Sequence, residues 1–254
     1  MSKPLVPWMG GKRRLAKHIL PLFPEHTCYV EPFSGAAALF FMKKPAKSEI
    51  INDINGELMN LYRVVKYHRD ALAEEINLMP VGRRQFQLYQ SQPLEHLTDI
   101  QRAARFYYLQ KTAFGGKVTG QHFGTMTDRG PRLNKRQFME DFEAAQSRLI
   151  YTVIENLPWQ DCVRRYDKQH TLFYCDPPYH KTADYGVKFG LDQFEEMARL
   201  AKSIKGKMLI SVNDLPEMRE IYSGLNVSTV DITYTIGGNG RSKNKTAELI
   251  IRNW

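Results

Sequence analysis

Short apolar runs that end at polar residues recur along the chain and predict the strands of a sheet. The clearest run, residues 172–175, stops at Asp176 and two prolines. A continuous apolar run bounded by a strong breaker is typical of a strand buried on both faces of a parallel sheet. Similar runs predict further strands over residues 27–31, 48–53, 151–156, 207–214, 227–236 and 247–251. The last two runs flank a glycine-rich segment and predict a β-hairpin.

Helical periodicity fills the intervals between these runs. It predicts helices over residues 13–20, 36–41, 57–77, 99–113, 134–150, 159–166, 193–204 and 217–222, the seventh capped by Asp192. Strands and helices alternate at both ends of the chain, which favours an α/β fold with a largely parallel sheet. Between residues 56 and 147 only helical patterns occur.

This change of pattern predicts the domain organisation. Residues 1–55 and 148–254 are expected to form the α/β domain, and residues 56–147 a helical insertion. Within the insertion, residues 114–125 are rich in glycine, aromatic and polar residues. A plain connector would be shorter and simpler, so we interpret this segment as a recognition loop.

Acidic residues follow several of the predicted strands. Glu31, Asp53, Asp176 and Asp214 each end a strand, and the carboxyl ends of parallel strands meet at one sheet edge, where α/β folds bind ligands. Asp53 also follows the turn at Gly35 by roughly the spacing of about 20 residues at which nucleotide-binding folds place a carboxylate on ribose hydroxyls.

The segment Asp176-Pro177-Pro178-Tyr179 carries the most specific chemistry. The two prolines stiffen the backbone and leave carbonyl oxygens as acceptors, while the tyrosine provides an aromatic wall. A carboxylate and carbonyl oxygens suit an amine on a conjugated ring, because accepting its hydrogens localises the nitrogen lone pair for attack. A positively charged donor such as a sulfonium needs no metal.

Charge and composition limit the kinds of partner that the chain is expected to bind. The net charge is +9 and the pI near 9.4, which favours a polyanion. Residues 101–136 carry eight basic residues against Asp128 alone, and Arg241, Lys243 and Lys245 form a second basic cluster. No run approaches the ~20 apolar residues of a membrane span. The three cysteines have no C-x-x-C spacing and are expected to be buried thiols of a cytosolic protein, with no metal site.

An ordered set of motifs resembles the Dam-type (D12 class) DNA adenine-N6 methyltransferases over nearly the whole chain. The set comprises residues 8–12 and 31–35, Asn52-Asp53, residues 176–179 and the final hairpin. The resemblance implies a Rossmann-like S-adenosylmethionine-dependent methyltransferase sheet with a C-terminal β-hairpin and a helical target-recognition insertion. It also implies transfer of a methyl group to N6 of an adenine flipped out of double-stranded DNA, with either site-specific or relaxed sequence specificity.

The resemblance implies three groups of site residues. The residues implied in catalysis are Asp176, Pro177, Pro178 and Tyr179. The residues implied in binding S-adenosylmethionine are Trp8, Gly10, Gly11, Lys12, Glu31, Phe33, Ser34, Gly35, Asp53, Asp161 and Asp176. DNA contacts are expected from Lys117, Gln121, His122, Arg129, Arg132, Arg241 and Lys243. Ala37 replaces a glycine common in the family, a change that a helical backbone would tolerate.

A monomer in the cytoplasm of a bacterial or phage-infected cell is expected, with double-stranded DNA as partner and no membrane or metal. The recognition sequence stays open, because the loop around Lys117 does not match the GATC-reading members. An enzyme acting on cytosine N4, RNA or a protein amide is the nearest alternative, although such enzymes more often carry Ser or Asn at position 176. A DNA-binding module without catalysis and a nicotinamide oxidoreductase fit less well, the latter because G-x-G-x-x-G is missing.

Overall fold

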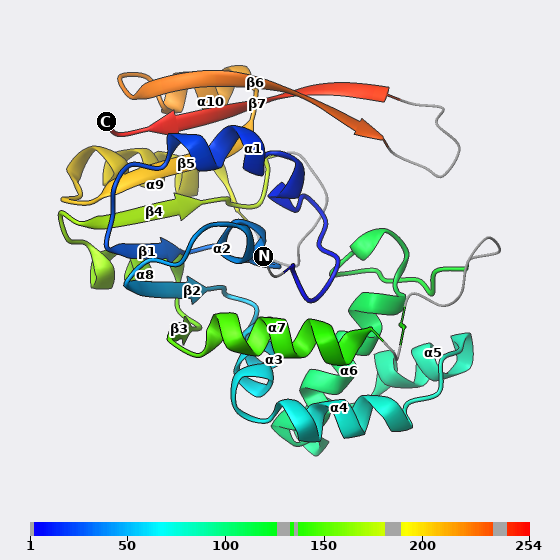
Figure 1. The fold of residues 1–254 in the computed structure, drawn as a ribbon. Helices are drawn as coiled ribbons and strands as arrows, with labels where there is room; N and C mark the ends of the chain where they lie inside the picture. The colour runs from blue at the N-terminus through cyan, green and yellow to red at the C-terminus, as the bar shows by residue number, and fades with distance from the viewer. Residues whose placement is uncertain (1–2, 126–132, 135–136, 181–188, 236–242) are drawn as a thin grey trace.

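A seven-stranded sheet forms the centre of the computed structural model, which describes residues 3–125, 133–134, 137–180, 189–235 and 243–254 (Figure 1). The strand order is β3-β2-β1-β4-β5-β7-β6. The strands are β1 Cys28–Glu31, β2 Ser48–Asn52, β3 Thr152–Glu155, β4 Thr171–Cys175, β5 Lys207–Asn213, β6 Asn226–Thr235 and β7 Lys243–Arg252. The first five run parallel, whereas β7 is antiparallel to β5 and β6. The predicted Rossmann-like α/β fold is confirmed.

Side chains that alternate along the strands pack into two hydrophobic cores, one on each face of the sheet. Val30, Phe173 and Cys175 point into one core, which is covered by α8 Trp159–Tyr166, α9 Leu191–Ser203 and α10 Pro216–Ile221. Tyr29 and Leu172 point into the other core. All three cysteines are buried and free.

The second core is covered by the N-terminal segment and by the helical insertion. It receives α1 Ala16–Ile19 and α2 Ala38–Met42 together with α3 Gly56–Tyr67, α4 Arg69–Leu78, α5 Arg83–Ser91, α6 Asp99–Thr112 and α7 Phe138–Leu149. Helices α3 to α7 lie together beside the β3 edge of the sheet (Figure 1). Their core is continuous with that of the sheet, so the division into two domains stays a prediction.

Several local predictions were wrong. The helix expected over residues 57–77 is interrupted at His68, and α5 was not predicted. The helix expected over residues 13–20 is only the short α1, flanked by 3-10 turns η1 Lys12–Arg14 and η2 Leu20–Leu22. Gly190 occupies the cap position of α9, and Asp192 lies in its first turn.

The backbone at Ala37 is not helical, contrary to the expectation. Ala37 has φ 52° and ψ 43°, the left-handed conformation that favours glycine, and it precedes α2 as the N-cap. An alanine there carries a strain of about 1 kcal/mol. Among the described residues, no helix is long and apolar enough to cross a membrane.

Candidate active site

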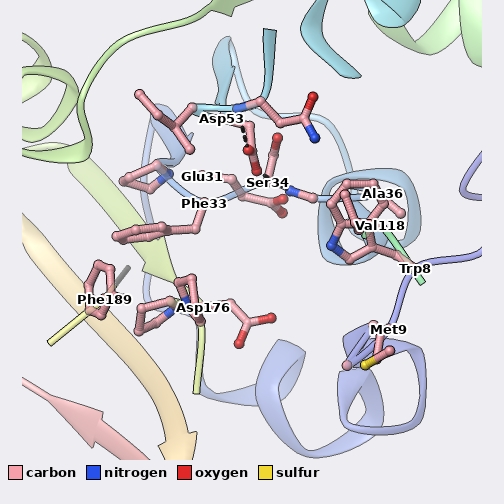
Figure 2. A pocket seen from close by; sticks show the side chains of 18 of the residues that line it. Trp8, Met9, Glu31, Phe33, Ser34, Ala36, Asp53, Val118, Asp176 and Phe189 are labelled. Atoms are coloured by element: carbon pink, nitrogen blue, oxygen red, sulfur yellow. Dashed lines mark hydrogen bonds between the residues drawn. The ribbon is translucent and has the colours of Figure 1, made fainter. Parts of the chain in front are cut away.

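A cavity of about 720 Å³ opens at the carboxyl ends of β1, β2 and β4 (Figure 2). This volume lies within the range of ligand-binding pockets. The structure brings most of the predicted catalytic and cofactor residues to its wall: Trp8, Gly10, Gly11, Lys12, Glu31, Phe33, Ser34, Gly35, Asp53, Asp176, Pro177, Pro178 and Tyr179. Val118 and Gln121 of the insertion line the same cavity. One space therefore joins the sheet edge to the helical insertion.

Asp176 directs its carboxylate into this cavity from the end of β4 (Figure 2). Its Oδ1 accepts from Lys12 Nζ at 2.7 Å and from Ser211 Oγ at 3.3 Å. The Ser211 hydroxyl also hydrogen-bonds with Tyr174 at 2.8 Å, which holds it in place. None of the contacts that the described residues make to this carboxylate involves Oδ2. Among the contacts of the described residues, Oδ2 stays available to accept from a ligand.

The pKa of Asp176 is raised to about 6, chiefly by burial. The Lys12 ammonium opposes this shift, while the charge of the buried Glu248 adds to it. Since this value lies below 7, the carboxylate is mostly ionised at neutral pH and can act as a hydrogen-bond acceptor.

The glycine-rich turn before η1 places Lys12 between two predicted catalytic residues. Lys12 is 4% exposed, and its Nζ donates to the carbonyl oxygen of Gly10 at 3.1 Å. The same ammonium lies 4.3 Å from the ring centroid of Tyr179. Gly10 has φ 73°, a conformation in which a side chain would be strained. The turn thus delivers a buried cation to both Asp176 and Tyr179.

Asp53 lies at the end of β2 and accepts two backbone hydrogen bonds. Gly35 N donates to Oδ2 at 2.9 Å, and Asn55 N donates to Oδ1 at 2.9 Å. Asn55, not Asp53, caps α3 by accepting from Leu58 N. Burial raises the pKa of Asp53. Each ionised carboxylate oxygen can accept further bonds, so Asp53 can also receive two hydroxyl groups.

Asn52 holds this region together, a role that sequence reasoning did not assign. It is fully buried, and its Nδ2 donates to the carbonyl oxygens of Pro32 at 2.9 Å and Leu157 at 3.1 Å. Its Oδ1 accepts from Leu157 N at 2.8 Å. These bonds fasten the loops after β1, β2 and β3 to one another. An amide at the end of a predicted buried strand was the available sign of this role.

The carboxyl groups of the pocket suit a cationic ligand. Glu31 is 2% exposed, accepts from Tyr29 OH at 2.6 Å, and has its pKa raised to about 7 by burial. Glu31, Asp53 and Asp176 bring three carboxyl groups to the sheet edge, where the Lys12 ammonium lies beside Asp176. Such a group attracts positive charge, particularly in its ionised form.

Three further features of the cavity wall suit a bound group. The buried hydroxyl of Ser34 has no hydrogen-bond partner among the described residues. A Cβ on Gly35 would lie 2.7 Å from Trp8 Nε1, so the indole rests directly on this turn. Phe33 adds an aromatic wall with Phe189, at a centroid distance of 5.6 Å. S-adenosylmethionine, with its sulfonium, ammonium, ribose and adenine, fits this set of donors, acceptors and apolar walls.

The remaining predicted residues lie elsewhere. Asp161 is on α8 with an exposed side chain beside Arg164 at 3.3 Å, and it is not among the described residues that line the pocket. Lys117 and His122 are exposed in the recognition loop. Gln121 turns its amide inward, donating to Gln110 Oε1 at 2.9 Å and Lys117 O at 2.8 Å. Arg129, Arg132, Arg241 and the side chain of Lys243 lie outside the described part of the chain.

Comparisons with known proteins agree with this arrangement. The family described as D12 class N6 adenine-specific DNA methyltransferase matches residues 8–236. The chain is 30% identical to a DNA adenine methylase of Haemophilus influenzae over 276 residues, which cover 98% of this chain and 92% of that protein. It is 27% identical to the type II methyltransferase M.CviBI of Paramecium bursaria Chlorella virus NC1A, covering 99% of this chain and 100% of the relative. It is 26% identical to the type II methyltransferase M1.LlaDCHI of Lactococcus lactis subsp. cremoris, covering 99% and 95%.

Proposed function

The chain belongs to the D12 class of N6 adenine-specific DNA methyltransferases, and from this premise we propose that Asp176 holds the amine of an adenine flipped out of double-stranded DNA. The observation that carries the proposal is that Asp176 lines the same cavity as Asp53, Trp8 and Gly35, the last two being in contact with each other. A methyl donor and an acceptor amine can therefore lie next to each other in one cavity.

Residues of the sheet edge would hold the cofactor. Asp53 would accept from the ribose hydroxyls, Ser34 Oγ would gain a partner, and Trp8 would cover one side of the site above Gly35. When bound, S-adenosylmethionine supplies a methyl group activated by its sulfonium charge. Glu31 and Asp176, when ionised, attract that positive charge.

The acidic pocket would act on the amine. Asp176 Oδ2 and the carbonyl oxygen of Pro177 would accept the two N6 hydrogens, while Pro178 stiffens the segment and Tyr179 stacks on the base. As N6 takes the methyl group from the sulfonium, whose carbon–sulfur bond breaks to leave a neutral thioether, N6 would become positively charged and the Asp176 carboxylate would stabilise that charge. One N6 proton then passes to Asp176 and on to solvent, which leaves a neutral methylated amine and restores the carboxylate.

The helical part, residues 56–147, would serve as the target-recognition domain. Lys117 and His122 are exposed on its loop. The ribbon after α6 runs on the side of the molecule where the parallel strands end (Figure 1). Lysine contacts to phosphates would supply affinity with little sequence information. Arg129, Arg132, Arg241 and Lys243 remain predicted DNA contacts.

A labelling experiment tests the function and the role of Asp176 together. Mixed-sequence DNA is incubated with methyl-labelled S-adenosylmethionine, and its nucleosides are then separated. We expect label in N6-methyldeoxyadenosine and a loss of at least about 100-fold in rate for Asp176→Asn, since a preorganised charge at the reacting atom is worth this much. Asp70→Asn, a change at an exposed acid on α4, should retain the activity. Label on cytosine, or an active Asp176→Asn, would contradict the proposal.

A further inference from the structure

Gln110 is a buried polar residue that connects the cofactor side of the cavity with the recognition loop. It lies on α6 and is fully buried. Its Nε2 donates to the carbonyl oxygens of Pro7 at 2.8 Å and Gly116 at 2.9 Å. Its Oε1 accepts from Gln121 Nε2 at 2.9 Å. One side chain thus joins the N-terminal segment to both halves of the loop.

The loop also packs directly on the backbone that carries Trp8. A Cβ on Gly116 would lie 3.2 Å from Pro7 C and 3.3 Å from Trp8 N, and Gly116 has φ 68°. On its other side, Trp8 presses its indole against Gly35 of the cofactor turn. Trp8 is therefore held between the recognition loop and the predicted cofactor site. Val118 of the loop and Trp8 both line the cavity (Figure 2).

These contacts make the positions of Trp8 and the loop depend on each other. The amide of Gln110 is buried, so moving the loop away would leave its Oε1 and one Nε2 hydrogen without partners. Moving Pro7 and Trp8 would leave the other Nε2 hydrogen of Gln110 without its acceptor, Pro7 O. A ligand that fixes Trp8 therefore also favours one arrangement of the loop.

We propose that Gln110 is a positioning residue that couples occupation of the cofactor pocket to the recognition loop, so that cofactor and DNA bind cooperatively. This inference rests on the proposed function, since it takes the cofactor to bind against Trp8 and the loop to contact DNA. Thermodynamic reciprocity requires the same factor in both directions: DNA must raise cofactor affinity as much as cofactor raises DNA affinity.

The test is a thermodynamic cycle with the full chain, S-adenosylhomocysteine and a mixed-sequence DNA duplex. We expect saturating S-adenosylhomocysteine to tighten DNA binding by the wild type by about fivefold or more, the usual range for coupled sites. Gln110→Met keeps a side chain of similar length without hydrogen bonds and should bring this factor close to one. Gln146→Met is the matched control, because Gln146 donates one bond to Lys66 O at 3.1 Å and is not among the described residues of the pocket or loop.

Amide hydrogen exchange gives a second readout that a loss of stability alone would not imitate. The loop is closed by Phe114 N donating to His122 O at 2.8 Å and by Gly124 N donating to Thr112 O at 2.8 Å. S-adenosylhomocysteine should slow exchange at these amides in the wild type and in Gln146→Met. It should leave their exchange unchanged in Gln110→Met.

The outcomes separate this inference from the proposed function. Failure of the wild type to bind S-adenosylhomocysteine in calorimetry would overturn the cofactor site itself. Binding without coupling in the wild type, or wild-type coupling and protection in Gln110→Met, would overturn the role of Gln110 alone. If Gln110→Met does not fold, Gln121→Met removes one of the two bonds between the loop and Gln110, the bond to Oε1, and should still lower the coupling factor. An unchanged factor in that variant contradicts the inference.

Discussion

The ammonium of Lys12 lies 2.7 Å from Oδ1 of Asp176, so the lysine controls how easily the proposed acceptor takes up a proton. The positive charge lowers the pKa of Asp176, against the effect of burial, and the balance leaves it at about 6. Because Asp176 is proposed to accept hydrogens from the target amine, only its ionised form can act. The acid limb of the activity profile should follow this pKa.

Lys12→Met removes the charge and should raise the pKa of Asp176 above its present value. The acid limb of kcat should then move to higher pH, with a loss of activity at pH 7 that is partly recovered in more alkaline buffer. The measurement is the pH profile of kcat with cofactor and DNA both saturating, so that weaker binding does not enter. Lys17→Met, at an exposed lysine on α1, should keep the wild-type profile. An unchanged acid limb in Lys12→Met would show that Lys12 does not set this pKa.

Glu31 should make cofactor affinity depend on pH near neutrality. Burial raises its pKa to about 7, so its negative charge develops between about pH 6 and pH 8. The attraction for the cationic cofactor should grow over this range, and the Kd for S-adenosylmethionine should fall. Glu31→Gln should flatten this dependence and weaken binding about tenfold at pH 8, equivalent to about 1.4 kcal/mol.

Calorimetric titrations at several pH values measure this effect. Glu155→Gln is a suitable control, because Glu155 is half-buried on β3, where it accepts from Tyr166 OH at 2.6 Å, and it does not line the described pocket. That variant should keep the slope of the wild type. Equal slopes in the wild type and Glu31→Gln would remove Glu31 from the cofactor site.

The sheet and its acidic edge could be predicted because their causes are local. An apolar run followed by Glu31, Asp53 or Asp176 carries both the strand and the position of the acid, and parallel pairing brings these ends together. Contacts between distant segments could not be predicted in this way. Asn52 binds Leu157 and Gln110 binds Pro7, and nothing adjacent in sequence indicates either partner.

The prediction of helix boundaries was wrong where tertiary packing determines where a helix begins or ends. The break at His68 has neither glycine nor proline, and α5 buries only Phe86 among mostly polar residues. This helix has only nine residues and few apolar side chains, too little for a helix to be predicted from the sequence. The left-handed backbone at Ala37 is also a tertiary effect, because alanine does not favour that conformation by itself.

Gly35→Ala should disturb the cofactor site through Trp8. The new methyl group would lie 2.7 Å from Trp8 Nε1, and φ of 47° adds a strain of about 1 kcal/mol. We expect the indole to move and S-adenosylhomocysteine to bind at least about tenfold more weakly, a loss of about 1.4 kcal/mol in calorimetry. Gly115→Ala has a similar left-handed φ of 72° but nothing within 4 Å of the new Cβ. It should carry the strain yet keep the affinity, and equal losses in both variants would contradict the clash.

The sheet and the helical insertion should unfold together, because one core joins them. Phe41 of α2 lies against Tyr62 of α3 at a centroid distance of 6.1 Å, and Arg148 of α7 donates to Phe40 O at 2.9 Å. All three tryptophans lie outside residues 56–147, so their fluorescence reports on the sheet part, whereas far-ultraviolet circular dichroism reports largely on the helices. Denaturant curves from the two probes should coincide. Phe142→Ala, a fully buried change on α7, should destabilise the protein by about 3–5 kcal/mol and shift both curves equally. A shift of the dichroism curve alone would show that the insertion unfolds as an independent unit.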